Sequence, residues 1–245
     1  MEKYYLRVFE VDITDKCNLK CASCLHFSPL TTEPFFYSED VFESDIKRMS
    51  ELFNCSEIRL LGGEPLLHDK LKNLIDIVYK YFPKVKLLIM SNGILKDKLD
   101  EIKKYCHEIG IKSDVKPSNY PLSNVLGDGS KNEFRFPNIN LNGNSNIEIS
   151  RILCNNKNYF SLYNGMLYIC PVMRNFDKFN NFFKLNIDIP ETDRAINIHT
   201  HSSSEVFLFI HGFNQGLKVC RYCNTTHPAI AWHRTNYELS EYVSK

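Results

Sequence analysis

The chain has 245 residues, of which 43% are hydrophobic and 24% charged, a composition that is ordinary for a folded globular protein. Lys and Arg number 30 and Asp and Glu 29, so the formal net charge is +1. A nucleic-acid partner or an anionic membrane surface favours a basic excess, and we therefore expect neither. No apolar run is long enough for a signal peptide or a membrane span, which favours a cytoplasmic protein. In that compartment nine cysteines indicate metal binding or catalysis before disulfides.

The first half of the chain alternates segments that are typical of strands and of helices. Strand composition or a short apolar run marks residues 5–13, 57–61, 85–90 and 111–116. Helical signals mark residues 39–53, with Ser38 as the N-cap, and residues 68–82 and 96–109. This alternation predicts an α/β fold with a parallel sheet, either an open doubly wound sheet or a partial barrel. Both architectures bind ligands at the carboxyl ends of their strands.

The periodicity weakens beyond residue 117. Residues 118–147 are rich in Asn, Gly, Ser and Pro, and we expect irregular structure there. Asn164-Gly165 lies between apolar runs and predicts a hairpin over residues 159–170. A helix is expected near residues 175–183, followed by a His/Ser-rich loop at 199–204 and an apolar stretch.

Three cysteines follow the first predicted strand in a C-x3-C-x2-C arrangement, at Cys17, Cys21 and Cys24. Three thiolates on one loop can hold three corners of a 4Fe–4S cluster and leave one iron open to another ligand. A structural zinc site completed by His26 is the alternative that this spacing allows.

The next two predicted strands also end in residues suited to ligand binding. Gly62-Gly63-Glu64-Pro65 ends the second strand, and Ser91-Asn92-Gly93 ends the third. Paired glycines let a backbone approach a ligand closely, and the Glu64 carboxylate can accept hydrogen bonds from an ammonium group. We therefore expect a ligand site at the sheet edge that carries Cys17.

Together, the cysteine spacing and the Gly62–Pro65 strand end resemble the radical S-adenosylmethionine (SAM) superfamily, over roughly residues 5–117. The resemblance implies a partial (β/α)6 TIM-like barrel in which Cys17, Cys21 and Cys24 hold a 4Fe–4S cluster whose open iron binds SAM. It also implies SAM contacts from the strand ends, at Gly62, Gly63, Glu64, Pro65, Ser91 and Asn92.

The same resemblance implies the chemistry. An external electron donor such as flavodoxin or ferredoxin reduces the cluster, SAM is cleaved to a 5′-deoxyadenosyl radical, and this radical takes a hydrogen atom from a small-molecule substrate. The family usually has an aromatic residue just before the third cysteine, packed near adenine. This chain has Ser23 there, so Leu25 or Phe27 would have to replace it.

A second group of cysteines lies in the second half, at Cys154, Cys170, Cys220 and Cys223. Four thiolates complete a second 4Fe–4S cluster, and a zinc knuckle made from the same residues is the alternative. Their two-plus-two order is similar to that of the auxiliary-cluster "twitch" group, shortened relatives of the SPASM domains, and to the butirosin-type aminocyclitol dehydrogenases. The resemblance implies a radical SAM core at residues 1–147 and a small auxiliary-cluster extension at residues 148–245.

These features favour an oxidoreductase that converts an alcohol of a small polyol, sugar or aminocyclitol into a ketone, with the auxiliary cluster as electron acceptor. A peptide maturase, a sugar epimerase and a zinc-stabilised binding module are the alternatives. No general base is assigned; the candidates are His199, His201, Arg135 and Arg151. We expect Cys55 and Cys106 to be buried free cysteines.

Overall fold

A seven-stranded, mostly parallel sheet organises the chain. The computed structural model describes residues 3–110, 113–117, 133–134, 138–154, 157, 159–212, 217–226 and 230–243. The strand order is β4-β3-β2-β1-β7-β8-β9. The strands are β1 (Tyr4–Thr14), β2 (Phe53–Gly62), β3 (Lys86–Ser91), β4 (Ser113–Pro117), β7 (Phe160–Tyr163), β8 (Met166–Tyr168) and β9 (Ala195–Asn197). Strands β1 to β4 and β7 run parallel, whereas β8 is antiparallel to both of its neighbours.

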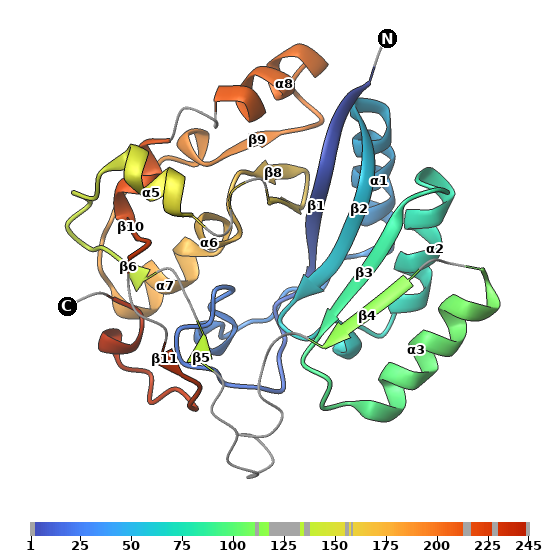
Figure 1. Ribbon diagram of the computed structural model, residues 1–245, viewed down its shortest axis with the longest axis horizontal. Helices are drawn as coiled ribbons and strands as arrows, with labels where there is room; N and C mark the ends of the chain where they lie inside the picture. The colour runs from blue at the N-terminus through green and yellow to red at the C-terminus, as the bar shows by residue number, and fades with distance from the viewer. Residues whose placement is uncertain are drawn as a thin grey trace.

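Helices cover the sheet, and two short ladders lie apart from it. The helices are α1 (Glu39–Leu52), α2 (Leu71–Tyr81), α3 (Lys96–Glu108), α5 (Ile147–Leu153), α6 (Pro171–Arg174), α7 (Phe176–Phe183) and α8 (Ser203–Gly212). The ladders pair β6 (Asn138–Ile139) with β10 (Cys223–Asn224) and β5 (Glu133–Phe134) with β11 (Ile230–Ala231). Helices α1 to α3 gather beside β1 to β4, and α5 to α7 lie on the other side of β1 (Figure 1). Among the described residues, no helix has the length and apolarity needed to cross a membrane.

The predicted α/β class with a largely parallel sheet is confirmed. Helices α1 and α3 have nearly the predicted bounds. Helix α2 begins at Leu71 rather than at residue 68 because a 3-10 turn, Pro65–Leu67, comes first. In the described residues the strand–helix alternation runs through four strands and three helices, and β7 adds a fifth parallel strand at the other edge of β1.

The second half contains more regular structure than its composition indicates. The hairpin is confirmed, and Asn164 and Gly165 have positive φ angles of 47° and 77°, as a type I′ turn requires. Helix α5 was not expected, although Asn146 caps it by accepting a hydrogen bond from Ile149 N at 2.9 Å. Helix α8 covers the apolar stretch that the sequence left unassigned. Residues 118–132 and 135–137 of the predicted irregular segment, 118–147, lie outside the described residues.

Strand β1 is the centre of the sheet and has two different faces. Phe9, Val11 and Ile13 belong to the hydrophobic core. Because side chains alternate along a strand, Glu10 and Asp12 project from the opposite face, where they are also buried. The hydrophobic core therefore fills one side of β1, and the other side carries the two buried carboxylates towards the end of the strand.

A buried carboxylate attaches the hairpin to helix α1. Asp45, which is 1% exposed, accepts hydrogen bonds from Gly165 N at 2.7 Å and from the Tyr37 hydroxyl, and it contacts His199 Nε2 at 2.5 Å. The Tyr37 hydroxyl also accepts a hydrogen bond from Asn164 N at 2.6 Å. Since β7 joins the second half of the chain to β1, Asp45 helps to hold the two halves in register.

We predict that Asp45→Ala lowers the free energy of unfolding by about 3 kcal/mol, because it leaves buried donors without an acceptor. Urea denaturation under anaerobic conditions measures this change. Glu51→Ala is the matched control on the same helix, since Glu51 is exposed and forms a surface ion pair with Arg48; about 0.5 kcal/mol or less is expected. Equal losses in the two variants would contradict the role of Asp45.

Candidate functional site

The first three cysteines lie on the loop that leaves β1. Cys21 and Cys24 are buried, and Cys17 is half-buried. Burial is the main cause that raises the pKa of the Cys17 and Cys21 thiols to about 12, and proximity to Cys24 contributes to that rise. Burial also raises the pKa of Cys24. The three sulfurs are close enough to influence one another, and Cys21 and Cys24 are more shielded from water than Cys17.

N–H groups are directed at these sulfurs. Leu19 N donates to Cys17 Sγ at 3.4 Å, and Asn92 Nδ2 lies 4.0 Å from the same atom. Backbone N–H groups after Cys24 also donate to its sulfur. Such N–H···S bonds are a regular feature of iron–sulfur sites, where they stabilise negative charge on the thiolates. Three buried thiols with N–H donors therefore form a donor set that fits a 4Fe–4S cluster.

His26 does not complete a zinc site with these cysteines. Its Nδ1 lies 2.8 Å from Asp12 Oδ1, which leaves Nε2 as the ring nitrogen that a metal could use. Throughout the described ranges, no three His, Cys, Asp or Glu side chains converge as ligands of a single metal ion. A cubane cluster spreads its thiolates over separate iron atoms and does not need that convergence.

The paired glycines are required by the cysteine loop itself. A Cβ on Gly62 would lie 2.1 Å from Thr14 O, and one on Gly63 would lie 2.2 Å from Lys16 O. Gly63 N donates to Thr14 O at 2.7 Å, and Glu64 N donates to Lys16 O at 2.8 Å. Backbone hydrogen bonds therefore join the end of β2 to the segment that leads into Cys17, and only glycine permits such a close approach of the two backbones.

Glu64 links the ends of β2 and β3. Its carboxylate is fully buried and accepts hydrogen bonds from Leu66 N at 3.1 Å and from Asn92 N at 2.8 Å. Burial raises the pKa of Glu64, and these bonds oppose the shift. Asn92 in turn donates from Nδ2 to Asn18 Oδ1 at 2.7 Å, within the cysteine loop. The sequence missed this structural role; the SAM contacts expected of Gly62, Gly63, Glu64, Pro65, Ser91 and Asn92 stay predictions.

Phe27, one of two residues expected to replace the aromatic residue missing at Ser23, packs into the core instead. Its ring lies 5.3 Å from that of Phe179 and 5.9 Å from that of Tyr242, and it is buried. The Ser23 hydroxyl donates to Glu241 O.

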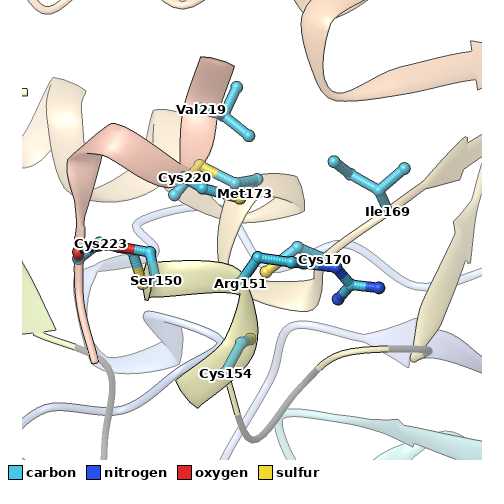
Figure 2. Close-up of a pocket in the computed structure, with 9 residues that line it drawn as sticks. All are labelled: Ser150, Arg151, Cys154, Ile169, Cys170, Met173, Val219, Cys220 and Cys223. Carbon is cyan, nitrogen blue, oxygen red and sulfur yellow. Dashed lines mark hydrogen bonds between the residues drawn. The ribbon is translucent and has the colours of Figure 1, made fainter. Parts of the chain in front are cut away.

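The four cysteines of the second group come together around one cavity. Cys154 ends α5, Cys170 precedes α6, Cys220 lies in the 3-10 turn Lys218–Tyr222, and Cys223 begins β10. The rest of the cavity wall consists of Ser150, Arg151, Ile169, Met173 and Val219. Figure 2 shows the four thiols around this space, reaching it from separate segments of the chain.

Thiols and one guanidinium dominate the chemistry of this cavity. Burial raises the pKa of Cys170 to about 12 and also raises the pKa of Cys220 and Cys223, and the neighbouring thiols add to each shift. Burial lowers the pKa of Arg151, and the Cys154, Cys220 and Cys170 thiols oppose that shift. Four thiols in an otherwise mostly apolar wall fit a fully cysteine-ligated 4Fe–4S cluster, and that assignment stays a prediction.

The candidate bases are scattered. His199 contacts Asp45 in the hairpin network, and exposed His201 lies with Nδ1 3.0 Å from Asn197 O. Arg151 belongs to the second cysteine group, and Arg135 lies outside the described residues. None of these three described candidates is therefore assigned as a general base at the first cysteine group.

The two cysteines outside the groups differ in burial. Cys106 is buried, as expected, whereas Cys55 is half-buried and its thiol donates to Glu57 O at 3.0 Å.

A buried charge network between the two cysteine groups was missed. Arg174 Nη1 lies 3.2 Å from Asp12 Oδ2 and 3.4 Å from Asp15 Oδ1, and Lys178 Nζ lies 2.6 Å from Asp15 Oδ1. Burial would raise the pKa of Asp12, but Arg174 and His26 hold it well below its usual range. One local signal, the charged residues inside an apolar strand, marks a buried polar position there but does not identify the partners.

Glu10 extends this polar face. Its Oε1 lies 3.2 Å from Arg59 Nη1, and burial raises the pKa of Glu10 to about 7. Because the folded pKa lies above the unfolded value, ionisation favours the unfolded state progressively between about pH 4.5 and pH 7.

We predict that Glu10→Gln becomes more stable relative to the wild type as the pH rises through that window, by up to about 3 kcal/mol. Arg59 keeps its contact with Glu57 at 2.7 Å in the variant. Chemical denaturation at pH 5 and pH 8 measures the difference in free energy of unfolding between the variant and the wild type. If this difference stays constant or narrows as the pH rises, burial does not dominate the pKa of Glu10.

We predict that Gly63→Ala prevents cluster loading at the first cysteine group, because its Cβ would collide with Lys16 O. Iron analysis after anaerobic reconstitution should show about four fewer irons per chain. Gly212→Ala is the matched control, since its added Cβ meets no atom within 4 Å among the described residues outside its own helix backbone and chain neighbours. Normal iron content in Gly63→Ala would contradict the requirement.

Comparison with known proteins agrees with this geometry. Residues 11–114 match the model of the Radical SAM superfamily. The GTP 3′,8-cyclase of Nautilia profundicola is 32% identical over 111 residues, which are 44% of this chain and 32% of the cyclase. Molybdenum cofactor biosynthesis protein 1 of Dictyostelium discoideum is 35% identical over 105 residues, which are 41% of this chain and 16% of that protein. The match spans about a third of the cyclase's length or less.

The solved structure of BtrN in complex with AdoMet and 2-DOIA resembles nearly the whole chain. Its TM-score is 0.53 at 16% identity, with 99% of this chain and 100% of BtrN covered. At this identity the likeness is one of fold. Together with the cysteine loop and the strand ends, the family match shows that residues 11–114 of this chain form a radical SAM domain.

Proposed function

We propose that the chain oxidises a secondary alcohol of a small polyol, sugar or aminocyclitol to a ketone by radical SAM chemistry. The observation that carries this proposal is the second cysteine group: Cys154, Cys170, Cys220 and Cys223 line one cavity in a chain that already has a radical SAM domain. Four cysteines complete the ligation of a 4Fe–4S cluster and leave no iron open, which suits a role in electron transfer.

In this proposal Cys17, Cys21 and Cys24 hold the SAM-binding cluster, and the ends of β2 and β3 hold SAM. The bound cofactors supply a 5′-deoxyadenosyl radical, and an external donor such as flavodoxin or ferredoxin supplies the electron for its formation. The backbone hydrogen bonds that Gly63 and Glu64 donate hold the start of the cysteine loop in place beside the site. The protein's part is to position the reacting groups and to exclude water.

The oxidation balances with two clusters. The alcohol carbon gives a hydrogen atom to the deoxyadenosyl group, which leaves as 5′-deoxyadenosine. The hydroxyl proton would pass to a base, and a cluster held by Cys154, Cys170, Cys220 and Cys223 would supply the acceptor for the remaining electron. The carbon–oxygen bond becomes a carbonyl. One 5′-deoxyadenosine is formed for each substrate molecule oxidised.

We predict that wild-type protein reconstituted anaerobically contains about eight irons per chain. Cys17→Ala should abolish 5′-deoxyadenosine formation after reduction. Cys223→Ala should lose about four irons and keep SAM cleavage, yet form no ketone. Liquid chromatography with mass spectrometry measures both products, and a polyol and aminocyclitol panel with deuterium at carbon identifies the substrate through label transfer. If Cys223→Ala makes ketone at the wild-type rate, the second group is not the electron acceptor.

A GTP-derived product is the second candidate, because curated relatives that match the radical SAM domain are named GTP 3′,8-cyclase. That similarity covers less than half of this chain. Incubation with GTP in place of the polyol panel tests it: a new nucleotide product would favour cyclase-like chemistry. A sugar product at the oxidation level of its substrate would favour an epimerase, and modification of a peptide would favour a maturase.

A further inference from the structure

The C-terminal part of the chain returns to the first cysteine loop. Residues 232–235, called here the strap, run antiparallel to residues 20–22, with a bridge between Cys21 and Arg234. Ala22 N donates to His233 O at 3.0 Å, and Thr235 N donates to Lys20 O at 2.8 Å. The strap therefore forms a short two-stranded ladder with the loop that carries the cysteines.

The residues after the strap anchor it. The Glu241 carboxylate accepts hydrogen bonds from the Thr235 hydroxyl and from Asn236 N, the latter at 3.0 Å. The Ser23 hydroxyl donates to Glu241 O, which adds a second link to the cysteine loop. Tyr242 is buried, with its ring 5.9 Å from that of Phe27. The ladder with residues 20–22 and the contacts of Glu241 and Tyr242 together hold the strap in position.

Trp232 begins the strap and is the one tryptophan of the chain. Its Nε1 is buried and has no hydrogen-bond partner of ordinary geometry among the described groups. The pairing of the strap with residues 20–22 places Trp232 beside the cysteine loop. There the indole N–H acts as a donor to the Cys21 sulfur. A buried indole N–H is costly to leave without an acceptor, and the sulfur is the acceptor within reach.

We propose that Trp232 is a positioning residue for the SAM-binding cluster, donating its indole N–H to the Cys21 thiolate and thereby raising the cluster's reduction potential. The inference rests on the proposed function, since it requires a cluster at the first cysteine group. A hydrogen bond to a cluster thiolate stabilises the reduced state more than the oxidised state, because the added electron increases the negative charge on the sulfurs. The strap fixes the distance and direction of this donor.

The test is a redox titration of the reconstituted protein that is monitored by electron paramagnetic resonance. The signal that changes when SAM is added reports the cluster at the first cysteine group. Trp232→Phe keeps an aromatic ring and removes the N–H; its SAM-sensitive signal should shift to a more negative midpoint. Trp232→His restores a ring N–H and should move the midpoint back towards the wild type. The SAM-insensitive signal should keep its midpoint in both variants.

Tyr237→Phe is the matched control, since it alters another aromatic side chain of the same C-terminal segment and should leave the midpoint unchanged. An unchanged midpoint in Trp232→Phe, with wild-type iron content, would overturn the inference and leave the proposed function intact. Absence of any SAM-sensitive signal in the wild type would overturn both.

Tryptophan fluorescence provides a readout that does not depend on a variant of Trp232. Cluster assembly should quench the emission, and a variant with Cys17, Cys21 and Cys24 all changed to Ala should lose most of that quenching. Loss of the second group through Cys220→Ala and Cys223→Ala should remove the smaller part. The reverse order would place Trp232 nearer to the second group and contradict the contact with Cys21.

Discussion

A buried ion pair at the end of β1 sets the relation between the two cysteine groups. The Arg174 guanidinium is nearly inaccessible to water and lies between Asp12 and Asp15. Helix α6 begins after Cys170 and ends at Arg174, whereas Asp15 precedes Cys17 by two positions. Removing one partner would leave an uncompensated buried charge, at a cost of about 3–5 kcal/mol. The same contact that satisfies these charges therefore joins the second cysteine group to the first.

The ends of the parallel strands impose the second constraint. Gly62 and Gly63 allow the backbone of β2 to touch the start of the cysteine loop. Glu64 accepts a hydrogen bond from Asn92 N at the neighbouring strand end with one carboxylate oxygen and from Leu66 N, just after β2, with the other. A conformational entropy cost accompanies each ordered loop residue. Backbone hydrogen bonds from adjacent strands offset that cost, so the loop is ordered by the sheet and not by its own sequence alone.

The C-terminal region contributes to both cysteine groups. Cys220 and Cys223 line the second cavity, and the chain then returns to pair with the loop around Cys21. The two groups are thus connected through α6 on one side and through the strap on the other. Under the proposed function, these two connections would hold the SAM-binding cluster and the electron-accepting cluster in a constant relation.

The amino-acid sequence by itself determined the α/β class, the helices between the parallel strands and the hairpin turn at Asn164-Gly165, because periodicity and turn chemistry are local properties. It also identified both sets of cysteines, since thiol spacing is legible without coordinates. Tertiary structure alone decided what surrounds them. The Arg174 ion pairs, the closeness of Gly63 to Lys16, and the return of Trp232 to Cys21 join residues that are far apart in the chain. Such contacts depend on how the elements pack, and no local pattern encodes them.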